Sequence, residues 1–261
     1  MKTSSNNLCQ MKSMIARLLL TFAFAAVAPF AWGAPGDGIA GSAHDFGTGL
    51  IAGETPGTCT YCHTPHMASN QALLWNQQAQ STTYSWTNAA TTGGTAYASI
   101  VSATNIGPSV KCLSCHDGTT TAGDMGWFNA TADPGGSTNV TVTADYVVGT
   151  IAGDMDGNHP VSMPFPLGGV ASTYNGSTTG ASALLSDWVA DPEAVGIRLF
   201  SDNLGVGATI QAGGLSGEAG IECSSCHDPH NGGSVKDVFL LRGDLGAGGG
   251  DTYICAKCHN R

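Results

Sequence analysis

Eight of the nine cysteines in this chain fall into four pairs with the spacing Cys-x-x-Cys, and a histidine directly follows each pair. The four motifs span 59–63, 112–116, 223–227 and 255–259. The ninth cysteine, Cys9, lies near the N-terminus, ahead of a long apolar run. One such motif arises easily by chance. Four motifs that use every other cysteine indicate one chemistry repeated four times.

Cys-x-x-Cys-His is the attachment signature of c-type haem. The two thiols form thioethers with the haem vinyl groups, and the histidine supplies the proximal nitrogen to the iron. The sequence therefore predicts four covalently bound haem c groups. The predicted thioether residues are Cys59, Cys62, Cys112, Cys115, Cys223, Cys226, Cys255 and Cys258, and the predicted proximal ligands are His63, His116, His227 and His259.

Three other uses of paired cysteines explain less of the pattern. A disulfide framework suits an exported chain with an even number of cysteines. Zinc sites also use Cys-x-x-Cys pairs, and a thioredoxin-like redox pair needs a single motif on a βαβ unit. None of these three explains a histidine after every second cysteine.

The number of histidines matches the number of axial positions on four irons. The chain has eight histidines, and four of them are not in a motif. We therefore predict bis-histidine ligation at every iron. Methionine is the competing distal ligand. Two alternatives therefore remain: one haem with His/Met ligation, or one iron with a vacant coordination position. The predicted distal histidines are His44, His66, His159 and His230, and the competing methionines are Met67, Met125, Met155 and Met163.

Two of the distal candidates occur in the same local sequence, His-x-Pro-His, at 63–66 and 227–230. A residue three positions after a proximal histidine lies on the same side of its own haem, so His66 and His230 are expected to serve neighbouring haems. The proline stiffens the connection. We predict that His66 serves the second haem and His230 the fourth, which leaves His44 and His159 for the first and third. The haems would then group in pairs at about 44–165 and 215–261.

His44 follows a glycine-rich stretch that contains Gly36, Gly38 and Gly41. Such an arm reaches either a haem of its own chain or a haem of the next subunit. In the second case the contact is head-to-tail, and it propagates into a filament unless the rotation closes a ring. The sequence leaves both possibilities open.

The first 33 residues have the features of a secretory signal peptide. Lys2, Lys12 and Arg17 precede an apolar run at 18–30, and small residues at 31 and 33 suit cleavage after position 33. Met11 and Met14 are alternative translation start sites. The run is too short to span a membrane. We expect 34–261 to be exported as one tetrahaem domain.

The remaining composition excludes some partners and limits the fold. Without 1–33 the chain keeps six of its nine basic residues and all 19 acidic ones, a formal charge of −13. This charge argues against nucleic acid and anionic lipid as partners.

The stretches 81–110 and 119–216 are rich in Gly, Ala, Ser and Thr, so haem would have to supply much of the core. We expect mostly coil with short helices after the motifs and few small strands. Particular expectations are a strand at 139–148, a strand or short helix at 235–241, and a helical turn within 186–200.

The motifs and their order resemble extracellular tetrahaem c-type cytochrome nanowire subunits of Geobacter-type metal-reducing bacteria. The resemblance rests on 42–46, 59–66, 112–118, 158–162, 223–230 and 255–259. It implies a mostly coil multihaem cytochrome c that polymerises into a filament with a continuous haem chain. It also implies bis-histidine irons, one distal histidine supplied by a neighbouring subunit, and other multihaem cytochromes or mineral acceptors as partners.

An iron with two histidine ligands has no open position for a substrate, so we expect electron transfer and not enzymatic catalysis. The favoured function is the polymerising subunit of an extracellular conductive filament. A discrete periplasmic or outer-membrane tetrahaem shuttle is the alternative. A multihaem reductase acting on a small oxyanion is a third possibility, and it would require a five-coordinate haem.

Overall fold

The computed structural model describes 33–47, 57–66, 68, 74–77, 83–88, 100–101, 107–118, 142, 144–148, 153–166, 185–201, 219–246 and 252–260. These ranges contain all four motifs and all eight histidines. The predicted signal peptide lies outside them except for Gly33, and so do Met67 and Met125. Within the described ranges, no helix has the length and apolar character needed to cross a membrane.

Helical structure is concentrated on the cysteine motifs themselves. The 3-10 helix η1 (Thr58–Tyr61), helix α3 (Pro108–His116), helix α4 (Cys223–Cys226) and the 3-10 helix η7 (Ile254–Lys257) each overlap one motif. These four helices lie on the motifs, not after them as expected. Between motifs lie the short turns η3 (Ala144–Tyr146), η5 (Leu185–Asp187) and η6 (Glu193–Val195).

The strands are two or three residues long and form two small antiparallel sheets. β1 (Thr83–Tyr84) pairs with β2 (Ile100–Val101). In the second sheet the order is β3-β5-β4, with β3 (Met163–Pro164) and β4 (Phe200–Ser201) on either side of β5 (Ala219–Ile221). Because β5 leads directly into α4, this sheet fixes where the third motif begins.

Two expected elements are absent from the described residues, and a third agrees with them. Of the strand expected at 139–148, residues 144–146 form the turn η3. The segment 235–241 consists of turns, with an isolated bridge at Leu241, and is neither strand nor helix. Single residues of these segments meet the motifs: Val148 N donates to His116 O, and Leu241 bridges His227. Within 186–200, η5 and η6 provide the expected helical turns on either side of Pro192.

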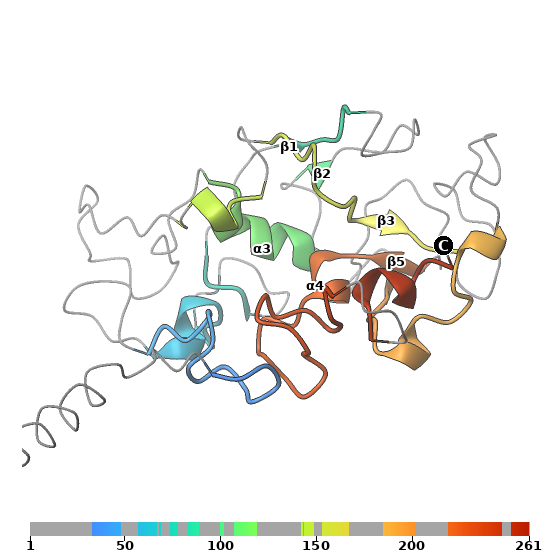
Figure 1. Cartoon of the computed structure of the whole chain (residues 1–261). Helices are drawn as coiled ribbons and strands as arrows, with labels where there is room; N and C mark the ends of the chain where they lie inside the picture. The colour runs from blue at the N-terminus through green and yellow to red at the C-terminus, as the bar shows by residue number, and fades with distance from the viewer. Residues whose placement is uncertain are drawn as a thin grey trace, which may run out of the picture.

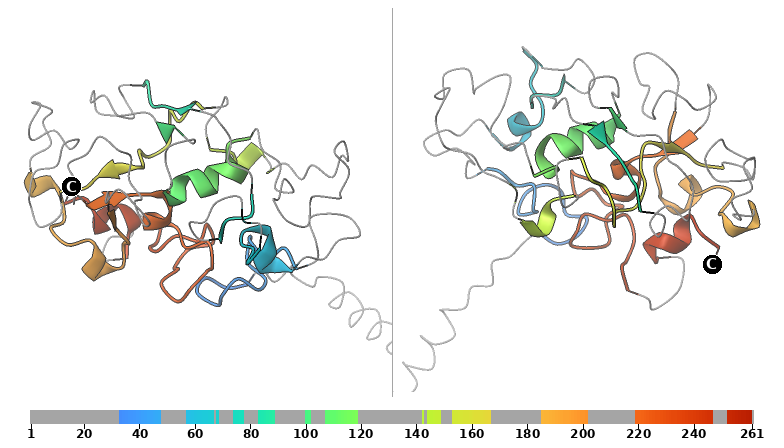
Figure 2. Two further views of the ribbon diagram at one scale, coloured as in Figure 1. Left: turned by 180° about the vertical axis from the view of Figure 1, so that it is seen from behind. Right: turned by 90° about the horizontal axis from the view of Figure 1, so that it is seen from above.

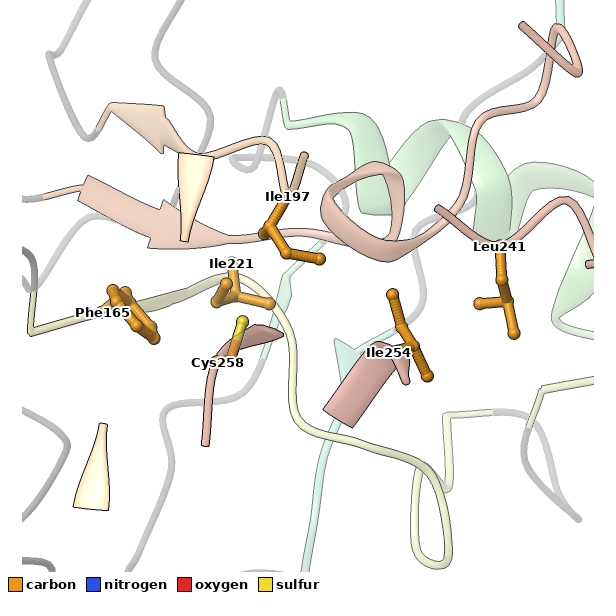
Figure 3. Packing of buried hydrophobic residues seen from close by; sticks show 6 residues of the cluster. All are labelled: Phe165, Ile197, Ile221, Leu241, Ile254 and Cys258. Carbon is orange, nitrogen blue, oxygen red and sulfur yellow. The ribbon is translucent and has the colours of Figure 1, made fainter. Parts of the chain in front are cut away.

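Two apolar clusters hold the motif helices in place. One joins Tyr84, Trp86 and Met155 to Val110 and Leu113 of α3. The other, shown in Figure 3, packs residues from β5, η7 and the intervening loops around the fourth motif. Its members are Phe165, Ile197, Ile221, Leu241, Ile254 and Cys258. The clusters are small, so a large part of the fold depends on loop hydrogen bonds.

The four motifs follow one another in space in the order of the chain. In Figure 1 they run from η1, drawn in cyan, through α3 and α4 to the dark red η7, and the reverse view in Figure 2 preserves this order. α3 and α4 lie in contact at the centre. A row of four attachment sites therefore runs along the molecule.

Candidate functional site

Three of the four motifs share one backbone geometry. The histidine N–H donates to the carbonyl of the first cysteine, at 2.8 Å in the first motif and 2.9 Å in the third and fourth. In the second motif the histidine ends the longer helix α3. A helical turn places residues i and i+3 on one face. Each pair of cysteines is therefore presented on one side of its turn.

The same three motifs are each paired with a second segment by an identical two-bond bridge. In the first motif, Thr64 N donates to Leu74 O and Asn76 N donates to Cys62 O, which places Trp75 opposite His63. The segments 240–242 and 187–189 repeat this pattern at the third and fourth motifs. The motif histidine is therefore fixed by backbone hydrogen bonds on both sides.

Two of these bridging segments pack a tryptophan against the motif histidine. The ring centroids of Trp75 and His63 are 5.7 Å apart, and those of Trp188 and His259 are 4.5 Å apart. The Trp75 indole N–H donates to Ser114 Oγ within the second motif at 3.2 Å. Trp75 therefore links the first motif to the second.

The structure places a motif histidine beside a histidine outside the motifs three times. In each pair the ring centroids are 6.0 to 6.3 Å apart. Two imidazoles that each bind one metal ion through a nitrogen about 2 Å away would have centroids roughly 6 Å apart. The spacing therefore fits an iron between the rings. The pairs are His116 with His44, His63 with His230, and His259 with His159.

Backbone carbonyls lie against Nδ1 in two motif histidines and two distal candidates. Nδ1 lies 2.8 Å from Tyr146 O in His116 and 2.9 Å from Phe239 O in His227. The distal candidates His44 and His159 have the same arrangement, with Pro229 O at 3.1 Å and Pro160 O at 2.8 Å. A carbonyl only accepts, so Nδ1 carries the proton and Nε2 keeps its lone pair. Metal-binding histidines are typically oriented in this way.

The neighbouring rings differ from the predicted pairing of distal candidates with motifs in two respects. His230 faces His63 of the first motif, not His259 of the fourth. His44 and His159 face the second and fourth motifs, not the first and third. His230 still lies against a motif other than its own, as the His-x-Pro-His argument predicts. The partners differ because long loops, not chain order, decide which rings meet.

The two remaining histidines of the predicted ligand set are His66 and His227. His66 lies on the surface beyond the first motif, and Thr64 Oγ1 donates to its carbonyl at 2.8 Å. His227 lies next to the rings of His44 and His116, and burial is the main cause that lowers its pKa. A lowered pKa favours neutral imidazole, the form that binds metal.

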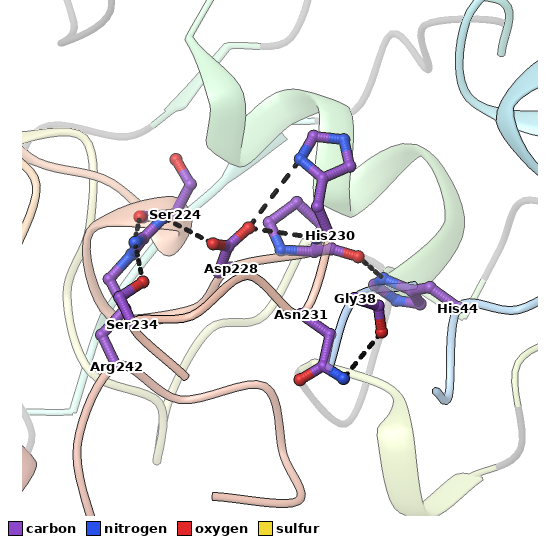
Figure 4. Close-up of polar contacts among 9 residues, drawn as sticks. Gly38, His44, Ser224, Asp228, His230, Asn231, Ser234 and Arg242 are labelled. Atoms are coloured by element: carbon purple, nitrogen blue, oxygen red, sulfur yellow. Dashed lines mark hydrogen bonds and ion pairs between the residues drawn. The ribbon is translucent and has the colours of Figure 1, made fainter. Parts of the chain in front are cut away.

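The arm that carries His44 is docked onto its own chain (Figure 4). Asn231, 1% exposed, donates from its side chain to Ala34 O at 3.0 Å and Gly38 O at 2.8 Å, and its Oδ1 accepts from Gly36 N at 2.9 Å. Gly36 and Gly38 have φ values of 88° and 96°, which only glycine adopts readily. The arm and the His44 ring therefore contact residues 229–231 of the same chain.

The second cysteine of every motif lies in a desolvated environment. Burial raises the pKa of Cys62 and Cys226 to about 11 and that of Cys115 and Cys258 to about 12. Zinc binds the thiolate, whereas a thioether carries no charge. These surroundings therefore fit haem attachment better than a zinc site.

Contacts between cysteines join neighbouring motifs. Cys62 contributes to raising the pKa of Cys115, and Cys255 contributes to that of Cys226. Between them, the side chains of Cys112 and Cys223 lie close enough that each affects the pKa of the other. Each motif therefore has its chain neighbour as its spatial neighbour.

Glu222 lies buried between the second and third motifs and was not singled out from the sequence. Its carboxylate accepts hydrogen bonds from Ser162 Oγ at 3.0 Å and from the N–H and hydroxyl of Ser109. Desolvation is the main cause that raises its pKa to about 8. A single glutamate before a cysteine carries no sequence signal, because its burial depends on the contact between α3 and α4.

This buried carboxyl predicts a pH-dependent stability. The pKa of Glu222 is about 8 in the folded chain against an ordinary value of 4.5, so the folded state holds the proton more tightly. The resulting stabilisation is complete below the ordinary value and is lost as the pH rises through 8, roughly 5 kcal/mol in all. In Glu222→Gln the fall in melting temperature between pH 5 and pH 9 is expected to become shallower. An unchanged pH profile would contradict this.

Large exposed apolar side chains occur beside all four motifs. Phe239 is the clearest case, because its carbonyl orients His227 while its side chain is 51% exposed. A flat apolar ligand attached at each motif would cover such surfaces, which monomers seldom leave exposed in groups. These side chains are Leu74 at the first motif, Tyr146 at the second, Val238 and Phe239 at the third, and Val195 at the fourth.

Of the competing methionine ligands, two are described. Met155 is 1% exposed and packs with Tyr84 and Trp86 in the apolar cluster under α3. Met163 belongs to β3, where it pairs with Ile221.

Comparison with known proteins adds no family assignment: no protein-family model matches the chain, and no curated protein is found to be similar to it. Among the described residues, no group of three or more His, Cys, Asp or Glu side chains is arranged to hold a bare metal ion.

Proposed function

We propose that the chain transfers electrons through four bis-histidine haem c groups and that identical subunits join head to tail into an extracellular conductive filament. The observation that carries the proposal is the set of three histidine pairs with centroids 6.0 to 6.3 Å apart, each joining a Cys-x-x-Cys-His motif to a histidine from elsewhere. Haem c would be held by the eight motif cysteines and the eight histidines.

Bound haem supplies one-electron transfer at its iron. The residues of this chain would position each haem and its axial ligands and keep substrate away from the iron. The motif turns present their cysteines on one side, the backbone bridges hold the proximal rings, and the carbonyls of Tyr146, Phe239, Pro229 and Pro160 keep Nδ1 protonated. Two imidazoles per iron exclude substrate from the metal, so we propose no enzymatic role.

The exposed surfaces at His66 and His227 support assembly between subunits. Each iron would take two axial histidines, and these two belong to the predicted ligand set. His66 lies on the surface near the exposed Leu74, and His227 lies beside the exposed Val238 and Phe239. We propose that His66 of one subunit binds the iron at His227 of the next, with these apolar side chains in the contact. A head-to-tail contact of this kind repeats without limit.

The resemblance to nanowire cytochromes and the predicted signal peptide support a location outside the cell or at its surface, reached through the periplasm. The partners would be identical subunits, other multihaem cytochromes and mineral acceptors. With eight ionised propionates, the charge of 34–261 would be about −21. Such a charge opposes lateral packing of filaments and favours contacts at their ends.

Covalent haem content tests the proposal before any assembly is examined. The full chain, produced with c-type haem maturation and exported, is expected to keep four haems through acid–acetone extraction and to give an intact mass raised by four haems. Its oxidised spectrum is expected to be entirely low-spin, as two histidines per iron require. Extractable haem, or a chain that binds zinc instead, would overturn it. A five-coordinate signal that binds cyanide would favour the reductase.

A further inference from the structure

We propose that Asp228 and Arg242 set the reduction potential of the haem held by His63 and His230. This inference rests on the proposed function, because it concerns a haem bound at that pair. Asp228 directly follows His227 of the third motif, yet its carboxylate faces His230, the distal candidate of the first site. One side chain therefore connects two haem sites.

Figure 4 shows the geometry. Asp228 Oδ1 accepts a hydrogen bond from His230 N at 3.1 Å and lies 3.8 Å from His230 Nδ1. The second distance is too long for a hydrogen bond, so the carboxylate acts on the ring through its charge. On its other side, Asp228 Oδ2 lies 3.5 Å from Arg242 Nη2. The negative end of this ion pair is the end nearer the histidine.

The side chains of Asp228 and Arg242 are both held in place by their surroundings. Arg242 Nη1 donates to Ser234 Oγ at 2.7 Å, Nε donates to Ser224 O at 3.3 Å, and the backbone N–H donates to Cys226 O at 2.8 Å. The side chains of Asp228 and Arg242 are 14% and 13% exposed. A Cβ on Gly232 would lie 2.8 Å from Asp228 Oδ2, so a larger residue would displace the carboxylate. The pair is thus a fixed dipole with little screening from solvent.

The sign of the effect follows from the charge of the iron. Oxidation adds a positive charge at the metal, and a nearby carboxylate stabilises that state and makes the imidazole a stronger donor. Asp228 therefore lowers the potential of this haem, and Arg242 partly offsets it. The distal candidates His44 and His159 face neutral carbonyls at Nδ1 instead. Among His44, His159 and His230, the ring of His230 is accordingly the one that faces a carboxylate.

The test uses two single variants of the haem-loaded full chain, Asp228→Asn and Arg242→Gln, with the four potentials resolved by spectroelectrochemical titration. Asp228→Asn is expected to raise the potential at the His63/His230 site, and Arg242→Gln to lower it. The site is assigned from His230→Met, which removes its bis-imidazole signal. Asp191→Asn removes an exposed carboxylate that precedes η6 and is expected to leave all four potentials unchanged.

Opposite shifts distinguish an electrostatic role from a structural one. If the ion pair only holds the loop together, both variants break it and move the potential in the same direction, or lower the melting temperature without moving the potential. Either result would overturn the inference while the unaltered chain still shows four low-spin haems. Absence of covalent haem in the unaltered chain would overturn both the proposed function and this inference.

Discussion

Replacement of His66 by alanine is expected to abolish filament formation while all four haems stay attached. The proposed contact supplies His66 to the iron at His227 of the next subunit, so its loss removes both a ligand and the contact. About one quarter of the iron is expected to become high-spin. Negative-stain microscopy of the cell-surface fraction would show dispersed subunits, and intact mass would still show four haems.

His44→Ala is the matched control, because it also removes one distal histidine. His44 lies 6.0 Å, centroid to centroid, from His116 of its own chain, and Pro229 of the same chain holds its Nδ1. The same fraction of high-spin iron is therefore expected, but with filaments retained. Filaments lost in His44→Ala and kept in His66→Ala would show that the other arm crosses between subunits. Filaments kept in both variants would show that neither histidine joins the subunits, whereas absence of filaments from the unaltered chain would support the discrete shuttle.

Replacement of Asn231 is expected to release the N-terminal arm and with it the ligand His44. Three hydrogen bonds from this one side chain hold the arm, and at about 1 kcal/mol each they contribute roughly 3 kcal/mol to its docking. Asn231→Ala should therefore produce a high-spin signal from the iron at His116 and lower the melting temperature.

A second variant separates the hydrogen bonds from backbone strain. Asn231 has a φ of 51°, a left-handed conformation that costs alanine about 1–2 kcal/mol but costs glycine little. Asn231→Gly removes the side-chain bonds without that strain, so it should give the same high-spin fraction with a smaller loss of stability. Electron paramagnetic resonance measures the high-spin fraction of iron in both variants. Fully low-spin iron in Asn231→Gly would show that the arm does not depend on Asn231.

The local chemistry of the sites is readable from the sequence, because it lies within five consecutive residues. The spacing of Cys59, Cys62 and His63 is enough to predict the attachment unit, and the structure gives it a helical turn. The expectation that His230 meets a motif other than its own follows from the reach of a three-residue step. It agrees with the contact between His230 and His63.

The pairing of distal and proximal rings is not readable in this way. His159 is about a hundred residues from His259, and the chain between them, rich in Gly, Ala, Ser and Thr, has no periodicity that fixes its path. The outcome depends on small contacts, such as Asn231 holding the arm of His44. The sequence carries no signal for Glu222, Asp228 and Arg242 for the same reason. Their roles arise only when separate motifs pack together.

Cryo-electron microscopy of the cell-surface fraction that carries the haem-stained band of this protein tests the central claim most directly. We expect four haems per subunit, which follow one another in space in the order of their motifs along the chain. His63 with His230, His116 with His44, and His259 with His159 would lie on opposite faces of three of them, and His66 of the neighbouring subunit would complete the fourth. A particle in which these histidines bind no haem iron, or in which the motif cysteines form disulfides or hold zinc, would contradict it.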